Sequence, residues 1–198
     1  MTEPTNPARY YWTRHTDGAG RWHLTGPGQG MPPGADLAKL KRGLGRRAGE
    51  VPEMWRFYTT LNHEGDETSQ FVAEHHALTL FALHQQSQAR PMHREGIGLG
   101  TAVRNLRSEH AGDDDPIDRR LGAAATATSR TELVLHLRGL ITLLRGINRP
   151  LDYTLLYKQI LTWDRPEMAA RTRRRWGSEY FVGHAGGKPS AASSRREG

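Results

Sequence analysis

The stretch ADLAKLKRGLGRRAGEVPEMWRFY, from Ala35 to Tyr58, carries the clearest helical pattern in the first third of this chain. Three leucines recur at spacings of three and four residues, as on one face of a helix: Leu37, Leu40 and Leu44. A second helical turn is expected to begin at Pro52, because proline is favoured at the first position of a helix. The aromatic and apolar residues after Pro52 would anchor the stretch against a core. We therefore expect helices here, packed on an apolar interior.

The same stretch carries a basic face opposite the leucines. Lys39, Arg42 and Arg46 would fall on that face of a continuous helix. Gly43 and Gly45 predict that the helix ends before Arg46, so the direction of that residue stays open. A basic face of this kind is either a solvated surface or a binding surface for a polyanion, and the stretch alone leaves both readings open.

Length and composition restrict the class of protein. The chain has 198 residues, of which 36% are hydrophobic, which is enough for one medium domain or two small helical bundles. Its formal net charge of +7 indicates a polyanionic partner. The chain has no cysteine, which excludes disulfides, thiolate metal ligands and thiol catalysis.

The chain shows no sign of a targeting or membrane segment. Its N-terminal sequence, MTEPTNPARYYW, lacks the apolar centre of a signal peptide. No apolar run approaches the roughly 20 residues that a membrane-spanning helix needs. We therefore expect a cytoplasmic protein with no membrane contact.

Helical periodicity and helix-start signals recur along the rest of the chain. A helix is predicted from about Ser69 to Ala89, ended by Pro91, and the clearest one follows a capping box formed by Ser129 and Glu132. Further helices are predicted around Leu99, Val103 and Leu106, after Asp115, after Asp152 and after Asp164. No segment alternates apolar and polar residues as a strand does. We predict an all-α fold of two packed helical bundles.

Four segments are expected along the chain. They are an N-terminal segment (1–34) with an exposed, flexible Gly/Pro-rich loop, an N-terminal bundle (35–110), a C-terminal bundle (111–182) and a disordered tail (183–198). The loop, from Asp17 to Gly34, is too rich in glycine and proline for a regular element. Trp22 within it either packs back on the body or waits for a partner.

Motifs for catalysis are weak throughout the sequence. Gly96, Gly98 and Gly100 do not have the spacing of a nucleotide-binding fingerprint, and a helix rather than a strand precedes them. Several histidines and the acidic run from Asp113 to Asp115 contain metal-ligand residue types, but no metal-site spacing joins them. No nucleophile elbow or phosphate-binding loop is present. We predict no enzymatic activity, no catalytic residue, no cofactor and no metal.

The basic residues are the remaining functional candidates. We predict that nucleic acid is bound by Lys39, Lys41, Arg42, Arg46, Arg119, Arg120, Arg130, Arg138 and Arg165. Cations spread over several helices suit contacts with a phosphate backbone rather than the reading of bases. Arg130 stands at a helix start outside the apolar stripe, so we expect it at the surface. Arg173 falls on the apolar side of the last helix and does not fit the pattern.

Seven blocks of the sequence, in this order, resemble the CasB family. The first four are LKRGLGR (Leu40 to Arg46), PEMWRFY (Pro52 to Tyr58), ALTLFALHQQS (Ala77 to Ser87) and MHREGIGLGTAVRNL (Met92 to Leu106). The last three are LHLRGLITLLR (Leu135 to Arg145), LDYTLLYKQILTW (Leu151 to Trp163) and RRRWGSEYF (Arg173 to Phe181). The resemblance covers about residues 35–181.

Members of that family are the small subunits of the type I-E CRISPR Cascade surveillance complex. The resemblance implies an all-helical subunit, present as two copies, that contacts the backbone subunits and the large subunit. It also implies a protein that is not a nuclease. Such a subunit braces the assembly and offers a basic surface to crRNA, to target DNA and to the displaced strand, which stabilises the R-loop in antiviral defence.

The family's basic positions can be carried over to this sequence. Lys41 and Arg42 match the early basic pair, and Arg119 and Arg120 match the pair after the acidic run. The start of the capped helix and the end of the Leu-Thr-Trp block correspond to Arg130 and Arg165, respectively. The Gly/Pro-rich loop departs from the family, where relatives often carry helix, and so does the segment before His75, where Ala73 and Glu74 replace a basic residue.

Two other functions stay open from the sequence alone. One is a stand-alone helical DNA-binding regulatory protein, which a palindromic, sequence-dependent footprint would favour. The other is a metal-dependent nuclease that uses the histidine and aspartate clusters, which metal-dependent cleavage lost on changing His76 or Asp114 would favour.

Overall fold

The computed structural model describes residues 10–26, 28–109 and 115–182, and these residues fold as helices without a β-strand. The elements are α1 (Tyr11–His15), α2 (Gly34–Lys41), a 3-10 helix η1 (Pro52–Phe57), α3 (Ser69–Gln85), α4 (Leu99–Glu109), α5 (Asp115–Thr126), α6 (Arg130–Gly146), α7 (Tyr153–Thr162) and α8 (Pro166–Phe181). The predicted all-α fold is confirmed. The predicted disordered tail and the residues Asp113 and Asp114 lie outside the described part of the chain.

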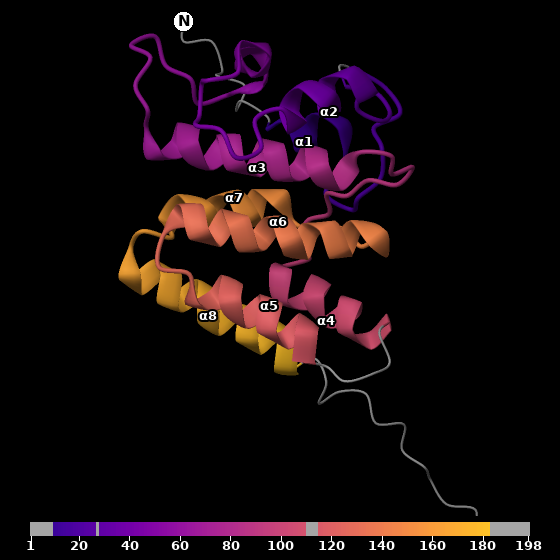
Figure 1. Cartoon of the computed structure of the whole chain (residues 1–198). Helices are drawn as coiled ribbons and strands as arrows, with labels where there is room; N and C mark the ends of the chain where they lie inside the picture. Colours follow the sequence, from indigo (N-terminus) through magenta and orange to yellow (C-terminus); the bar gives the residue numbers. More distant parts are fainter. Residues whose placement is uncertain (1–9, 27, 110–114, 183–198) are drawn as a thin grey trace, which may run out of the picture.

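The helices stack in three layers (Figure 1). The upper layer contains α1, α2 and α3, the middle layer α6 and α7, and the lower layer α4, α5 and α8. Helix α3 packs against α2 on one side and against α6 and α7 on the other, while α4 packs chiefly against α8. One continuous set of buried apolar side chains runs through all three layers. The division into two bundles at residue 110 stays a prediction, since α4, assigned to the first bundle, lies beside α8 of the second.

Helix α3 is buried along most of its length because other helices cover both sides of it. Its fully buried residues include Ala77, Leu78 and Phe81. The helix ends at Gln85 and not at Ala89 as the sequence suggested. The Gln85 side chain explains the early end, because its amide donates to the carbonyl oxygens of Gln88 and Arg90 and its oxygen accepts from the Met92 amide at 2.8 Å. These bonds satisfy backbone groups that another helical turn would otherwise have paired.

The predicted helix starts at Ser129 and Asp152 are confirmed. The Ser129 hydroxyl accepts from the Glu132 amide at 3.2 Å, and the Asp152 carboxylate accepts from the Leu155 amide at 2.9 Å. The Glu132 carboxylate reaches back to the amide and hydroxyl of Thr128, one residue before the cap. The bonds donated by the Glu132 and Leu155 amides satisfy groups that the first helical turn leaves unpaired.

Helix α1 connects the upper layer to the middle layer. Trp12 is completely buried, and its indole NH donates to the Thr154 hydroxyl of α7 at 3.0 Å. The predicted Gly/Pro-rich loop follows and forms no helix. It is nevertheless attached to the body, because the Trp22 indole donates to the Ala89 carbonyl at 3.0 Å and the Gly18 carbonyl accepts from the Glu95 amide at 3.1 Å. Trp22 thus packs back on the body.

No helix in the described part of the chain has both the length and the hydropathy of a membrane span.

A buried carboxylate on α3 fixes the segment that follows η1. Glu74 is fully buried and accepts hydrogen bonds from the amides and hydroxyls of Thr59 and Thr60, at 2.6–2.9 Å. A buried charge costs stability unless it is fully hydrogen-bonded, and these four donors meet that need. The Glu74 side chain therefore fixes the segment between η1 and α3 through the backbone and hydroxyl groups of Thr59 and Thr60.

Replacing Glu74 with glutamine should destabilise the fold, because the neutral amide turns an acceptor into a donor facing donors. We expect the free energy of unfolding to fall by about 2 kcal/mol and the melting temperature by about 4–8 °C, measured by circular dichroism. The exposed Glu64→Gln substitution is the control and should melt like the parent. An unchanged melt for Glu74→Gln would show that these bonds contribute little.

Candidate nucleic-acid interface

An open groove between α5 and α6 gathers two of the predicted basic residues. It has a volume of about 440 Å³ and is lined by Pro116, Arg119, Arg120, Ala123, Leu135, His136 and Gly139. Arg119 and Arg120 lie on exposed positions of α5. Among the described residues, the guanidinium group of Arg120 forms no ion pair. Arg138, also exposed, follows Leu135 by three residues on α6, so it lies next to the groove.

The sequence analysis missed the residues that α6 contributes to this groove. Leu135 is 66% exposed, although its neighbours Leu133 and Leu137 are completely buried. The helical repeat of the sequence could have shown this, because Leu135 falls outside the face that carries the buried leucines. His136 is half-buried and lies 3.8 Å from the Glu132 carboxylate. Their part in a groove with α5 became visible only from helix packing.

A second basic cluster lies at the end of α2, in the upper layer. Arg42 is ion-paired to Glu53 at 2.6 Å, and Lys41 donates to the Gln86 side chain at 2.6 Å. Lys39 lies 3.9 Å from Asp36. These contacts make Lys39, Lys41 and Arg42 less available to a phosphate than Arg120, although exposed pairs of this kind are weak, worth about 0–1 kcal/mol.

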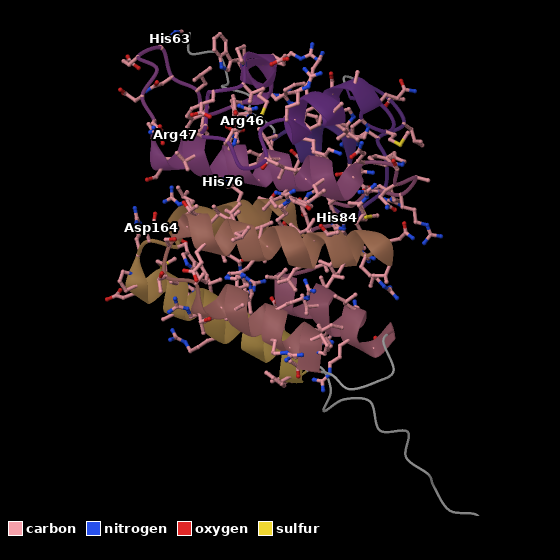
Figure 2. All side chains as sticks on the ribbon, viewed as in Figure 1. Arg46, Arg47, His63, His76, His84 and Asp164 are labelled. Carbon is pink, nitrogen blue, oxygen red and sulfur yellow. The ribbon has the colours of Figure 1, made fainter. Side chains whose placement is uncertain are left out.

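Arg46 is exposed in the turn after α2, and it has no ion pair within the described part of the chain. Figure 2 shows Arg46 and its neighbour Arg47 above α3. The His75 ring holds this turn, since its Nε2 lies 3.0 Å from the carbonyl oxygens of both Gly43 and Arg46. Its Nδ1 lies 2.8 Å from the Tyr58 hydroxyl. This contact fixes the backbone of the turn, and the Arg46 side chain, whose direction the sequence left open, is exposed.

Gly43 is required at the end of α2 by close packing. A Cβ atom there would overlap Met54 Sδ and lie 2.8 Å from the His75 ring. The predicted end of the helix before Arg46 is confirmed, since α2 stops at Lys41.

The prediction that Arg130 lies at the surface is wrong. Its side chain is only 13% exposed and pairs with Asp164 at 2.6 Å, at the connection between α7 and α8. It also approaches the Leu161 carbonyl at 3.4 Å. Arg130 stands at the very start of α6, where the end of α7 covers it, and sequence periodicity does not show that cover. Arg165, by contrast, is exposed at the start of α8.

Arg173, which did not fit the helical pattern, has a structural role. Its guanidinium donates to the carbonyl oxygens of Ala125 and Ala127 at 2.6 and 3.3 Å, and it lies 5.2 Å from the centre of the Trp163 ring. It therefore satisfies carbonyls at the end of α5 that the helix leaves unpaired, and it ties α8 to α5.

The histidines do not form a metal site in the described residues. Figure 2 shows His63, His76 and His84 in three separate places, and no group of three or more potential ligands converges within the described ranges. Burial lowers the pKa of His76 to about 4 and that of His84 to about 3. For His76, the neighbouring His75 and Arg130 act in the same direction. Both rings are therefore neutral at pH 7.

These lowered pKa values predict that acid destabilises the protein. A histidine in the unfolded chain has a pKa of about 6.5. Below that pH the unfolded chain therefore binds a proton at this ring, while the ring in the folded protein stays neutral. Stability is therefore full above pH 6.5 and falls as the pH drops toward about 4, by about 1.4 kcal/mol per pH unit for each such histidine. Denaturant unfolding between pH 7 and 4.5 measures this slope.

Replacing His76 with glutamine should flatten that slope by about one proton. The exposed His63 is the control, and His63→Gln should keep the slope of the parent. A parent slope that His76→Gln leaves unchanged would assign the acid sensitivity to other groups.

The burial of Arg130 gives a second testable difference. Arg130→Glu would place a second carboxylate beside Asp164 in a largely covered site, and we expect a loss of about 2 kcal/mol or more in unfolding free energy. The control, Arg165→Glu, changes an exposed residue and should stay within about 0.5 kcal/mol of the parent. Equal stability of the two variants, measured by denaturant unfolding, would contradict the packing of Arg130.

Fold and surface together define a class of protein. It is an all-helical protein with a basic groove between α5 of its lower layer and α6 of its middle layer. Several of its other arginines stabilise the fold. Residues 36–181 match the family model for CRISPR-associated protein Cse2 (CRISPR_cse2), and the chain belongs to this family. The predicted resemblance is confirmed. The match begins just after the Gly/Pro-rich loop, which the sequence analysis singled out as a departure from the family.

Solved structures agree with this assignment. CasB from Thermobifida fusca is 35% identical, with a TM-score of 0.61 over 74% of this chain and 84% of that protein. CasB from Thermus thermophilus is 23% identical, with a TM-score of 0.58 over 75% of this chain and 86% of that protein. A chain of a CRISPR RNA-guided surveillance complex is 21% identical, with a TM-score of 0.58 over 76% and 83%. The last two show a shared fold. No curated protein matches the sequence.

Proposed function

We propose that this protein is a non-catalytic small subunit of a Cascade-type, RNA-guided CRISPR surveillance complex. Family membership supports this proposal, as does the shared fold with a chain of a solved surveillance complex. Its partners would be the backbone subunits, the large subunit, a second copy of itself, crRNA and target DNA. The observation that carries the nucleic-acid part of the proposal is the groove where Arg119 and Arg120 stand exposed beside α6.

The proposed mechanism is electrostatic. When a guide RNA pairs with one DNA strand, the other strand is displaced, and its phosphates repel one another and those of the guide–target duplex unless cations neutralise them. Arginine suits this task because its planar guanidinium donates two parallel hydrogen bonds to a phosphate. Arg120 and Arg138 form no ion pair with any described residue, so a phosphate need not displace a carboxylate from them. Neutralising the displaced strand would slow closure of the R-loop.

The basic cluster at α2 would play a different part. Lys41 and Arg42 contact Gln86 and Glu53, so a phosphate would have to compete with partners already in place. Arg46 is the member of that cluster best placed for a phosphate, because the His75 contacts fix its turn while its side chain stays exposed. The two clusters lie in different layers (Figure 1), so one strand would have to cross the middle layer to reach both.

The charge reversals Arg119→Glu and Arg120→Glu together should weaken target binding by the assembled complex. Each lost phosphate contact should flatten the dependence of log affinity on log salt by about one unit, and the new carboxylates add repulsion. The R-loop lifetime should shorten, measured by dissociation of labelled target DNA from the purified complex. Subunit assembly, measured by size-exclusion chromatography, should stay normal.

The matched control reverses Arg171 and Arg174, which are exposed on α8 and give the same change in net charge. A loss limited to the α5 variant supports a specific site. Equal losses of target binding for both variants would show that only the overall charge matters. Unchanged R-loop lifetimes would contradict the proposal. Failed assembly of the α5 variant would move these arginines to a subunit interface.

A further inference from the structure

The α5–α6 groove has features that contact with a phosphate backbone does not require. Its arginines stand beside apolar and small lining residues, namely Pro116, Ala123, Leu135 and Gly139. A single exposed leucine on a protein surface is ordinary. Here, however, the exposed Leu135 shares a hollow with the other apolar residues and with the His136 ring. The groove therefore combines positive charge from α5 with apolar surface from both helices.

Gly139 keeps this hollow open, although the packing of α6 does not demand a glycine there. A Cβ atom added at Gly139 would meet only the Arg120 guanidinium, at 3.7 Å, which is an ordinary contact. Gly100 on α4 is different, because a Cβ atom there would overlap the Trp176 carbonyl oxygen. A glycine inside a helix costs about 1 kcal/mol relative to alanine. At Gly139, the consequence of the missing side chain is the space in front of Arg120.

We infer that the α5–α6 groove seats one unstacked base of a bound single strand, with the adjoining phosphate on Arg119 and Arg120. A nucleotide combines a flat, largely apolar ring with a negative charge, and this groove combines apolar surface with arginines. Single strands present unstacked bases without the cost of opening base pairs, and proteins bind such bases on aromatic and histidine rings, arginine planes and apolar side chains. The volume of about 440 Å³ lies within the range of small-ligand sites, about 300–1,000 Å³.

The open hollow around Trp55 shows why the α5–α6 groove is the better seat for a base. Trp55 is 52% exposed there and lies with Leu61 and Phe71, which gives the hollow a large apolar surface. Its rim, however, carries Arg47 paired with Glu67 at 3.1 Å. That pairing leaves no uncompensated positive charge at the rim for a phosphate. The α5–α6 groove joins apolar surface to arginines, one of which, Arg120, is unpaired among the described residues.

The test compares two oligonucleotides that differ only in their bases. One is single-stranded oligo-thymidine, and the other is an abasic oligonucleotide of the same length and charge. The full-length parent should bind oligo-thymidine roughly fivefold or more tightly than the abasic strand, because a stacked base contributes about 1 kcal/mol or more. Fluorescence anisotropy at fixed salt measures both affinities.

Gly139→Leu fills the groove and should abolish that preference while leaving abasic binding and its salt dependence unchanged. Gly122→Leu is the matched control, because Gly122 lies on an exposed position of α5 and an added Cβ atom there meets nothing within 4 Å. Leucine is the better helix former, so both variants should fold. Circular-dichroism melting verifies this.

The inference rests on the proposed function, and the outcomes separate the two. If the parent binds neither oligonucleotide, both are overturned. If the parent binds both oligonucleotides equally, or if Gly139→Leu keeps the preference, the base seat is overturned while backbone binding stands. An equal loss on both oligonucleotides in Gly139→Leu also overturns it, since the block would then act on the phosphates. Unchanged oligonucleotide binding with failed complex assembly would assign the groove to an acidic peptide of a partner subunit.

Discussion

The structure depends on polar contacts that two neighbouring residues of α3 make with the chain before it. Glu74 binds the backbone and hydroxyls of Thr59 and Thr60, and His75 holds the turn after α2 through the carbonyls of Gly43 and Arg46. Residues 43–60 contain only one short 3-10 helix and therefore make few backbone hydrogen bonds of their own. Because the Glu74 carboxylate and the His75 ring are buried, losing either partner would leave an unpaired polar group inside the protein. The exposed Arg46 is positioned as a consequence of these contacts.

The arginines of this protein serve three different purposes. Arg173 completes the end of α5 and joins it to α8, and Arg130 ties the start of α6 to Asp164. Arg42 forms an exposed ion pair with Glu53. Arg120 has no carboxylate partner among the described residues and faces a groove. The net positive charge alone would therefore overestimate the number of arginines available to bind nucleic acid, since some of them are paired within the protein.

The pairing of charge with apolar surface separates the candidate surfaces. Around Trp55 the apolar surface is large, but the arginine at the rim is already paired with Glu67. Between α5 and α6 the apolar surface is smaller and the arginines are exposed. A polyanion gains most where cations have no competing partner, because each released counterion then adds directly to the affinity. The α5–α6 groove is therefore favoured over the cluster at α2, since Arg120 has no carboxylate partner among the described residues.

The sequence by itself determined the helical fold, the caps at Ser129 and Asp152, the end of α2 before Arg46 and the family. These features depend on neighbouring residues, through the helical repeat and through side chains that pair with nearby amides. Only the tertiary structure decided that α3 stops at Gln85, that Arg130 is covered, and that Leu135, His136 and Gly139 share a groove with Arg119 and Arg120. Each of these depends on segments that are distant along the chain or on competition between backbone and side-chain donors. Helical periodicity reports which face of a helix is apolar, but it does not report which neighbour covers that face.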